Sequence, residues 1–166
     1  MIILGIDPGL AIVGYGIIEY KAPRFTTLAY GAITTPAHTK VEDRLFTIHE
    51  KLNDIMTIYK PDDMAIEELF FNTNTTTGIS VAEARGVCLL SAKEHNINIF
   101  EYTPLQVKQS VVGYGRAEKA QVMLMVKTLL NLEKMPKLDD TADALAIALC
   151  HAHTGCSRIR DFYNQK

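Results

Sequence analysis

The sequence lacks a run of apolar residues long enough to cross a membrane. Its first apolar stretch, residues 1–6, ends at Asp7, whereas a spanning helix needs about 20 such residues. The same stretch lacks the basic flank and cleavage site of a signal peptide. Repeats, low-complexity segments and linkers are also missing from the 166 residues. We therefore expect a cytoplasmic protein with a single domain over residues 1–166, large enough to bury a sizeable core.

Cysteine is scarce as well. The three cysteines, Cys88, Cys150 and Cys156, cannot all pair within one chain, and reduced thiols are the usual state in the cytosol. Cys150 and Cys156 lie close in sequence to His151 and His153, residue types that zinc sites use. Adjacent positions of a helix point in different directions, so we reject a zinc site there.

A strong excess of charge of either sign is absent. The chain has 17 Lys and Arg against 19 Asp and Glu, a formal net charge of -2, which argues against a protein that holds DNA by charge alone. Acids outnumber bases between Val41 and Glu68, and bases outnumber acids between Pro104 and Lys137. A basic flank beside an acidic pocket suits an enzyme that holds a polyanion near metal ions. Solvated helix faces explain so small a basic excess equally well.

The spacing of apolar residues predicts the order of the elements. Runs rich in β-branched and aromatic residues predict strands at 2–7, 12–20, 25–35, 64–67 and 97–102. Three- and four-residue spacing predicts helices at 41–60, 79–95, 104 onward, 118–132 and 140–153, with a polar loop at 70–78. Thr103, Pro104 and Gln106 form a good helix start. We predict an α/β fold, in which three strands form an antiparallel meander within a mixed five-stranded sheet flanked by helices.

Four acidic residues stand where an acid is disfavoured. Asp7 and Glu67 each end an apolar strand, while Asp140 and Asp143 lie three apart on a helix that is apolar almost all round. Buried carboxylates are unfavourable and repel one another unless a cation joins them. Oxygen ligands select Mg²⁺ or Mn²⁺ over zinc, and two such ions can activate a water and stabilise the leaving oxygen of a phosphodiester. These acids therefore predict a two-metal nuclease site.

Each acid also has a plainer explanation. Asp7 begins a turn, Asp140 suits the positive end of a helix dipole, and Glu67, next to Glu68, could end a strand in solvent. That all four are merely structural is much less expected. The spacing leaves two pairs open: Glu67 or Glu68, and Asp139 or Asp140.

Motifs spread in order over nearly the whole chain carry a resemblance to a known family. They are Ile3-Leu4-Gly5-Ile6-Asp7-Pro8-Gly9 with Gly14-Tyr15-Gly16, Ala65-Ile66-Glu67 with Phe70, Ala84-Arg85-Gly86-Val87, Gln106-Val107-Lys108-Gln109 with Val111-Val112-Gly113, Ala117-Glu118-Lys119, and Asp140-Thr141-Ala142-Asp143-Ala144-Leu145-Ala146. In these motifs the chain resembles the RuvC family of Holliday junction resolvases. The resemblance implies a ribonuclease H-like fold and a crossover junction endodeoxyribonuclease of DNA recombination and repair.

The resemblance also implies roles for the four acids. It selects Glu67 over Glu68, and it matches Asp140 and Asp143, together with Asp7, to the catalytic positions that hold the metal. It implies two Mg²⁺ ions in each active site, with Mn²⁺ as the alternative. It further implies a homodimer that nicks a four-way junction symmetrically, leaving ends that a ligase can seal, and the branch-migration proteins RuvA and RuvB as partners.

Further residues gain a role only through the resemblance. Lys108 and Lys119 match family lysines that contact DNA, although by themselves they are ordinary exposed lysines. Phe70 matches an aromatic residue associated with base contact at the junction, although a core position fits it as well. The Asn72–Thr77 loop departs from some members, which leaves its role at the junction centre open. The helix from Ile79 is apolar on more than one face, which suits a partner subunit or an internal core.

Three other functions compete. Actin-like and sugar-kinase-like enzymes also open with an apolar strand, an aspartate and a glycine, but they need a second related domain that 166 residues do not provide. A non-catalytic junction-binding or scaffold protein has no need of four acids in costly positions. A ribonuclease H-like enzyme acting on RNA or on an RNA–DNA hybrid is the nearest alternative.

Overall fold

The computed structural model describes residues 1–69 and 75–155. Five strands form a single sheet in the order β3-β2-β1-β4-β5. They are β1 (Ile2–Asp7), β2 (Ile12–Lys21), β3 (Arg24–Thr34), β4 (Asp63–Glu67) and β5 (Asn98–Tyr102). β1, β2 and β3 are antiparallel, and β4 and β5 run parallel to β1. The predicted mixed five-stranded sheet with its antiparallel meander is confirmed.

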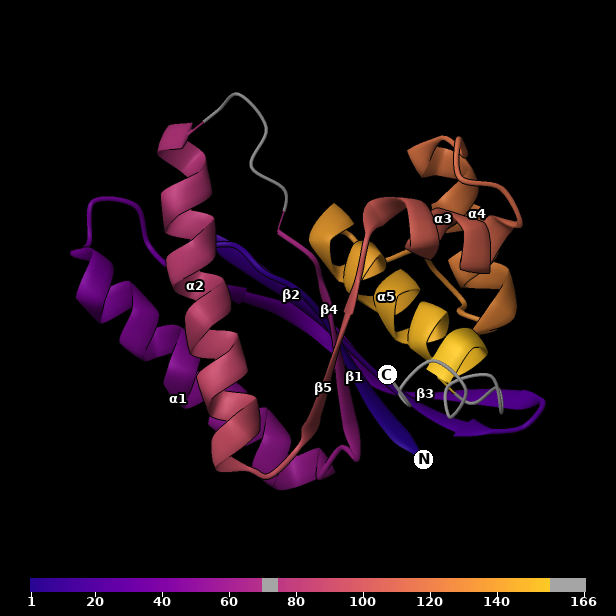
Figure 1. The fold of residues 1–166 in the computed structure, drawn as a ribbon, viewed down its shortest axis with the longest axis horizontal. Helices are drawn as coiled ribbons and strands as arrows, with labels where there is room; N and C mark the ends of the chain where they lie inside the picture. The colour runs from indigo at the N-terminus through magenta and orange to yellow at the C-terminus, as the bar shows by residue number, and fades with distance from the viewer. Residues whose placement is uncertain (70–74, 156–166) are drawn as a thin grey trace, which may run out of the picture.

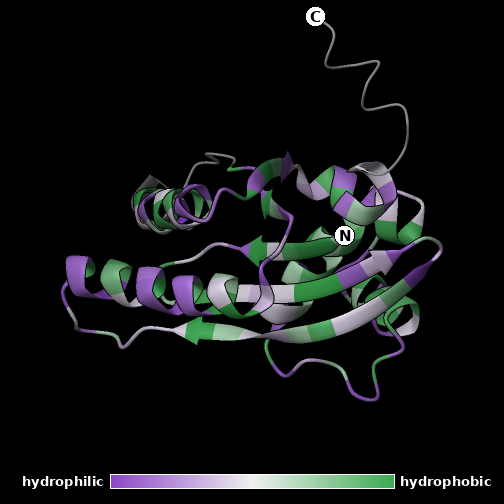
Figure 2. Cartoon of the chain, turned by 90° about the horizontal axis from the view of Figure 1, so that it is seen from below, coloured by the Kyte–Doolittle hydropathy of each residue, from purple (hydrophilic) through white to green (hydrophobic). Residues whose placement is uncertain are grey.

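Helices cover both faces of the sheet (Figure 1). α1 (Val41–Tyr59) and α2 (Thr75–Glu94) lie on one face, and α5 (Asp139–Gly155) lies on the other, with α3 (Pro104–Val112) and α4 (Lys119–Leu129) packed outside it. Figure 2 shows hydrophilic and hydrophobic residues alternating along α1, as expected of a helix with one face on the core. Within the described ranges, no helix combines the length and apolar character needed to cross a bilayer.

The two-residue period of β1 divides its side chains between two hydrophobic clusters. Ile3 belongs to the cluster around α5, whereas Leu4 and Ile6 belong to the cluster under α1 and α2. Successive side chains of a strand point to opposite faces of the sheet. Asp7, an even number of residues after Ile3, is therefore directed to the face that α5 covers.

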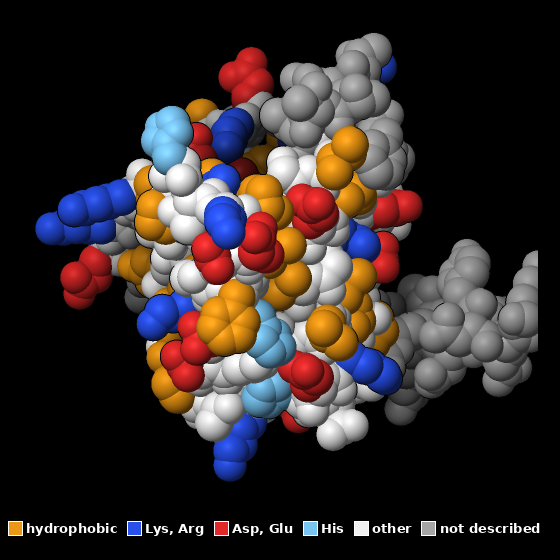
Figure 3. All heavy atoms as spheres, turned by 90° about the vertical axis from the view of Figure 1, so that its left-hand side faces the viewer, with side chains coloured by type: hydrophobic (Ala, Val, Ile, Leu, Met, Phe, Trp, Pro, Cys, Tyr) orange, Lys and Arg blue, Asp and Glu red, His pale blue; other side chains and the backbone are white. Residues whose placement is uncertain are grey.

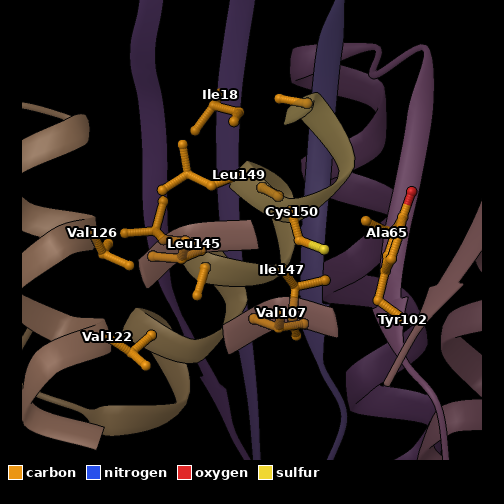
Figure 4. Packing of buried hydrophobic residues seen from close by; sticks show 14 of the residues in the cluster. Ile18, Ala65, Tyr102, Val107, Val122, Val126, Leu145, Ile147, Leu149 and Cys150 are labelled. Atoms are coloured by element: carbon orange, nitrogen blue, oxygen red, sulfur yellow. The ribbon is translucent and has the colours of Figure 1, made fainter. Parts of the chain in front are cut away.

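α5 is the central helix of the molecule. Every residue from Ala144 to Ala152 is buried, as its nearly all-round apolar sequence predicted, and Figure 4 shows its side chains lying between the sheet and those of α3 and α4. The helix can approach the sheet because of glycine. A Cβ at Gly5 would overlap the carbonyl oxygen of Ala144, and one at Gly14 would overlap that of Asp140. Glycines in β1 and β2 thus set the distance between α5 and the sheet.

Two predicted helix starts have different outcomes. The capping box before α3 is confirmed: the Gln106 backbone N–H donates to Thr103 Oγ1 at 3.2 Å, and the Thr103 N–H donates to Gln106 Oε1 at 2.8 Å. The predicted loop at 70–78 is wrong in its second half, because α2 begins at Thr75 and not at Ile79. A polar run resembles a loop, but threonine is tolerated in a first helical turn, where backbone N–H groups have no intrahelical acceptor.

Candidate active site

Asp7 and Glu67 stand at the ends of adjacent parallel strands. β1 and β4 are paired in register as far as Ile6 and Ile66, so the two acids follow at the same edge of the sheet. Ala65 packs in the cluster around α5, and Glu67, two residues later, is directed to the same face. The strand register and the alternation of side chains together place both carboxylates beside α5.

The first turn of α5 brings the other two predicted acids to this edge. Asp140 and Asp143 lie three residues apart and share one side of the helix. Gly14, which pairs with Asp7 in the β1–β2 register, leaves room for the Asp140 backbone directly above β2. Asp140 is therefore carried to the neighbourhood of Asp7 by a contact that no larger residue at position 14 permits.

The pKa of Asp7 reflects all three of the other predicted acids. Burial raises the pKa of Asp7 to about 7, and the charges of Glu67, Asp143 and Asp140 add to the rise. Burial also raises the pKa of Glu67, with a further contribution from Asp143. The charges of the other three acids therefore act on Asp7, and like charges this close disfavour the ionised form of its carboxyl group.

The two pairs that spacing left open differ in the structure. Glu68 is exposed, and its backbone N–H donates to the Tyr102 carbonyl at 2.9 Å. Asp139 is also exposed and forms an ion pair with Lys119. Neither Glu68 nor Asp139 contributes to the raised pKa of Asp7. The geometry therefore brings Glu67 and Asp140, and not their neighbours, to Asp7.

The two predicted DNA-binding lysines lie at one side of the cluster. Lys119 Nζ is 3.0 Å from Asp143 Oδ2 and 3.3 Å from Asp139 Oδ2. Its charge lowers the pKa of Asp7 and of Glu67, partly offsetting the effect of burial. Lys108 and Lys119 line a hollow of about 210 Å³ together with Glu67 and Asp143. Two lysine side chains therefore line the same hollow as two of the acids.

The donors fit hard divalent cations. All four candidate ligands are carboxylates, which Mg²⁺ and Mn²⁺ prefer, and the ammonium group already paired with Asp143 shows that a cation is attracted there. Among the described residues, no group of three or more His, Cys, Asp or Glu side chains is arranged so that it could hold a metal ion.

The remaining predicted residues are distributed as follows. Phe70 lies outside the described residues, as does the first part of the Asn72–Thr77 loop, whose end forms the start of α2. The histidines considered for zinc contact different elements. His151 Nε2 is 2.9 Å from Asp63 Oδ2, whereas His153 Nδ1 is 3.0 Å from the Ser110 carbonyl oxygen. Their ring nitrogens are occupied by protein contacts in two separate places.

Arg85 of α2 supports the site, although the sequence pattern did not single it out. Its Nη2 is 2.6 Å from Glu101 Oε2 on β5, and its Nε donates to the Glu67 carbonyl oxygen at 3.3 Å. Arg85 therefore ties α2 to the strand end that carries a candidate ligand. The signal that could have found it is an arginine within an otherwise apolar stretch of helix, in the motif Ala84-Arg85-Gly86-Val87.

Sequence comparison identifies a family. The family model described as crossover junction endodeoxyribonuclease RuvC matches residues 3–151. A protein of that name from Alkaliphilus oremlandii is 67% identical over 155 residues, which cover 93% of this chain and 94% of the relative. Another, from Clostridioides difficile, is 58% identical over 154 residues, with 93% and 91% covered.

Structural comparison agrees. The T. thermophilus RuvC in complex with Holliday junction substrate superimposes with a TM-score of 0.89 at 34% identity, covering 93% of this chain and 94% of that one. The Fowlpox virus resolvase, in complex with Holliday junction DNA, has a TM-score of 0.61 at 17% identity, with 90% and 97% covered. The second likeness concerns the fold alone.

Proposed function

The chain belongs to the RuvC family of crossover junction endodeoxyribonucleases, and on that premise we propose that the cluster around Asp7 is its catalytic centre. The protein is a ribonuclease H-like hydrolase that resolves Holliday junctions in DNA recombination and repair. The observation that carries the assignment of the centre is the meeting of four carboxylates from β1, β4 and α5 beside two lysines. We assign the whole activity to a single nuclease domain over residues 1–166, because both hydrophobic clusters share one sheet.

The family chemistry requires a divalent cation, and we propose two Mg²⁺ ions per site, with Mn²⁺ as a substitute. Asp7, Glu67, Asp140 and Asp143 would hold these ions, and this proposal is supported by the charges of Glu67, Asp143 and Asp140, which all raise the pKa of Asp7. Such ions supply an activated water and stabilise the departing 3′ oxygen of a phosphodiester. The protein contributes the positions of the backbone, because two paired strand ends and one helix turn carry the four carboxylates.

Lys108 and Lys119 are proposed to hold the DNA backbone beside the scissile phosphate. Both line the hollow that also contains Glu67 and Asp143, so a phosphate entering it meets cations and metal ligands together. Phosphate contacts of this kind position the substrate without reading its bases. Any preference for sequence at the junction must therefore come from base contacts, for which Phe70 is our candidate, or from deformation of the DNA.

The substrate is tested directly with a panel of nucleic acids. The protein is incubated with a synthetic four-way junction, a linear duplex of the same sequence and an RNA–DNA hybrid, each with and without Mg²⁺. We expect paired nicks at symmetric positions in the junction, only when Mg²⁺ is present. Cutting of the hybrid in preference to the junction would instead support the RNA-directed alternative, and junction binding without any nicking would support a scaffold.

The four acids are tested with matched neighbours. Asp7→Asn, Glu67→Gln, Asp140→Asn and Asp143→Asn each remove a candidate ligand, and loss of a ligand to a catalytic metal commonly lowers rates by several orders of magnitude. Junction binding in Ca²⁺ or EDTA should persist. Glu68→Gln and Asp139→Asn make the same chemical change one residue away and should retain most of the cleavage. Nicking by Asp7→Asn at the wild-type rate would refute the assignment.

A homodimer is proposed through the outer face of α2. Ile79 and Leu90 on this helix are 61% and 56% exposed, and Gly86 lies on the same face, seven residues after Ile79 and four before Leu90. A Cβ at Gly86 would meet no atom within 4 Å, so the protomer itself gives no reason for a glycine that weakens a helix by about 1 kcal/mol. Figure 3 shows hydrophobic side chains among charged ones on the face formed by α1 and α2. A second copy packing closely at Gly86 supplies the reason.

Two further assignments follow from the family. We propose that the enzyme works in the cytoplasm with its DNA substrate and acts with the branch-migration proteins RuvA and RuvB. The proposed dimer would place one active site on each of two strands of the junction. Addition of RuvA and RuvB should then change the rate or the position of nicking on a mobile junction.

A further inference from the structure

A second hollow adjoins the acidic cluster on the side away from Lys108 and Lys119. Its volume is about 390 Å³, and it reaches Asp140, which the first hollow does not. Its walls come from the turn between β1 and β2 and from α1, α2 and α5. The lining side chains that matter are Arg44 of α1 and Asp140 of α5, with residues 9–12 forming the floor.

Arg44 is the cation of this hollow, and its orientation is set by protein contacts. Its Nε donates to Thr35 Oγ1 at 2.8 Å. The Thr35 hydroxyl, which is buried, donates in turn to the Leu10 carbonyl at 2.6 Å. Because Nε is held by this relay, the two terminal nitrogens of the guanidinium retain the planar fork that binds phosphate oxygens in pairs.

Arg44 has no acidic partner in the described part of the chain. No carboxylate of residues 1–69 and 75–155 lies within 4.0 Å of its guanidinium, whereas Lys119 is paired with both Asp139 and Asp143. A half-buried arginine that shares a hollow with Asp140, held at one nitrogen and without an ion-pair partner among the described residues, is suited to an anion that arrives from outside. In the first hollow, Lys119 is already paired with two carboxylates.

We infer that the hollow around Arg44 is a second phosphate subsite, which binds a backbone phosphodiester of the cleaved strand next to the scissile one. This inference rests on the proposed nuclease function and extends it. The strand crosses the carboxylates with Lys108 and Lys119 at one side and Arg44 at the other. Two grips on either side of the reacting phosphate fix the direction of the P–O bonds, which an in-line displacement requires.

A structural explanation also exists, since Arg44 joins α1 to Thr35 and thereby to the β1–β2 turn. The two explanations differ in their effect on salt dependence. A protein that loses one phosphate contact releases one fewer counterion, which reduces the slope of log K against log salt by roughly 0.7–0.9. A protein that loses only an internal clamp becomes less stable and keeps its slope.

The test measures junction binding in EDTA by fluorescence anisotropy over a range of salt, together with thermal unfolding. Arg44→Gln should weaken binding about three- to tenfold at 0.1 M salt and reduce the slope by roughly 0.7–0.9. Arg24→Gln removes the same charge at the far end of β2 and β3, where Arg24 lies opposite Lys21 in the strand register. This variant should change neither the affinity nor the slope. Thr35→Val breaks the clamp but leaves the cation, and should lower the unfolding temperature at an unchanged slope.

The outcomes separate the inference from the function on which it rests. If the wild type neither binds nor nicks the junction, the proposed function fails. If the wild type does both and Arg44→Gln behaves like Thr35→Val, with a lower unfolding temperature and the full slope, the subsite is overturned. A second measurement locates the contact: single methylphosphonates are scanned along the cleaved strand. One position should weaken the wild type and leave Arg44→Gln unaffected, and strictly additive losses at every position would contradict the subsite.

Discussion

At the scale of single residues, a buried carboxylate with acidic neighbours opposes the folding of the protein at neutral pH. Asp7 is the clearest case, because burial and three neighbouring acids raise its pKa to about 7 from an ordinary value of 3.8. The folded state therefore holds a proton that the unfolded state releases between these two values. Stability contributed by this group is fully present below about pH 4 and is lost as the pH rises to about 7.

The pH dependence predicts that Asp7→Asn stabilises the metal-free protein. In EDTA at pH 8 the variant should unfold several degrees above the wild type, since a shift of this size corresponds to at most about 4 kcal/mol. The gain should disappear below about pH 4, where Asp7 is protonated in both states. Mg²⁺ should raise the unfolding temperature of the wild type more than that of the variant.

The control for this prediction is Asp54→Asn, which makes the same change at an exposed position of α1. Its unfolding temperature should follow that of the wild type at every pH. An Asp7→Asn protein less stable than the wild type at pH 8 in EDTA would show that the acids do not repel one another as their positions indicate.

At the scale of elements, the site depends on how closely α5 lies against the sheet. The helix carries Asp140 and Asp143 in its first turn, and its C-terminal half is anchored by His151, which contacts Asp63 on β4 at 2.9 Å and Tyr102 on β5 at 2.7 Å. The glycines of β1 and β2 set its height along the remaining length. Two of the four acids thus reach the cluster only through helix-to-sheet packing.

The variant Gly14→Ala tests whether the site depends on the packing of α5 against β2. The added methyl group overlaps the backbone of Asp140, so α5 must move at the turn that carries the acids, and overpacking of this kind commonly costs about 1–3 kcal/mol. We expect a lower urea midpoint, an unchanged helix content by circular dichroism and a severe loss of nicking. Full nicking and a wild-type midpoint would mean that α5 does not rest on β2 at this residue.

At the scale of the whole molecule, symmetric cleavage requires two active sites at a fixed separation. The outer face of α2 offers the surface for such an assembly, and Arg85 connects this helix to the Glu67 carbonyl and to Glu101. A subunit packed on α2 is therefore linked by an ion pair and a hydrogen bond to the strand end that carries Glu67. In the proposed dimer, assembly and the geometry of the site share one helix.

Leu90→Gln should weaken the dimer, because an exposed leucine on α2 would lose its burial against the second copy. Light scattering across a dilution series should show dissociation at a concentration at least about tenfold higher than for the wild type. Nicked but unresolved junctions should accumulate, since the two cuts become independent. Leu124→Gln alters an equally exposed leucine, 64% accessible, on α4 and should remain dimeric. A wild type that is monomeric at every concentration would remove the basis of this prediction.

Much of the fold could be predicted from local patterns. The strands of the meander, α1 and the start of α3 were identified because apolar spacing and capping act over a few residues. α2 was placed four residues late because its first turn is polar, and polarity near a helix start does not distinguish a turn from a loop. Arg85 and Arg44 received no role, because their partners are distant in sequence or belong to the ligand.

The sequence by itself determined that Asp7 and Glu67 end buried strands and that Asp140 and Asp143 share one side of a buried helix. These properties follow from the spacing of apolar residues, which repeats every two residues in a strand and every three to four in a helix, and this spacing can be read from a short segment. Spacing alone left Glu67 or Glu68 and Asp139 or Asp140 open; the family resemblance selected Glu67 and Asp140, and in the tertiary structure these two, and not their neighbours, raise the pKa of Asp7. Strand register and the glycine-dependent height of α5 make that choice, and both arise from contacts between segments far apart in the chain.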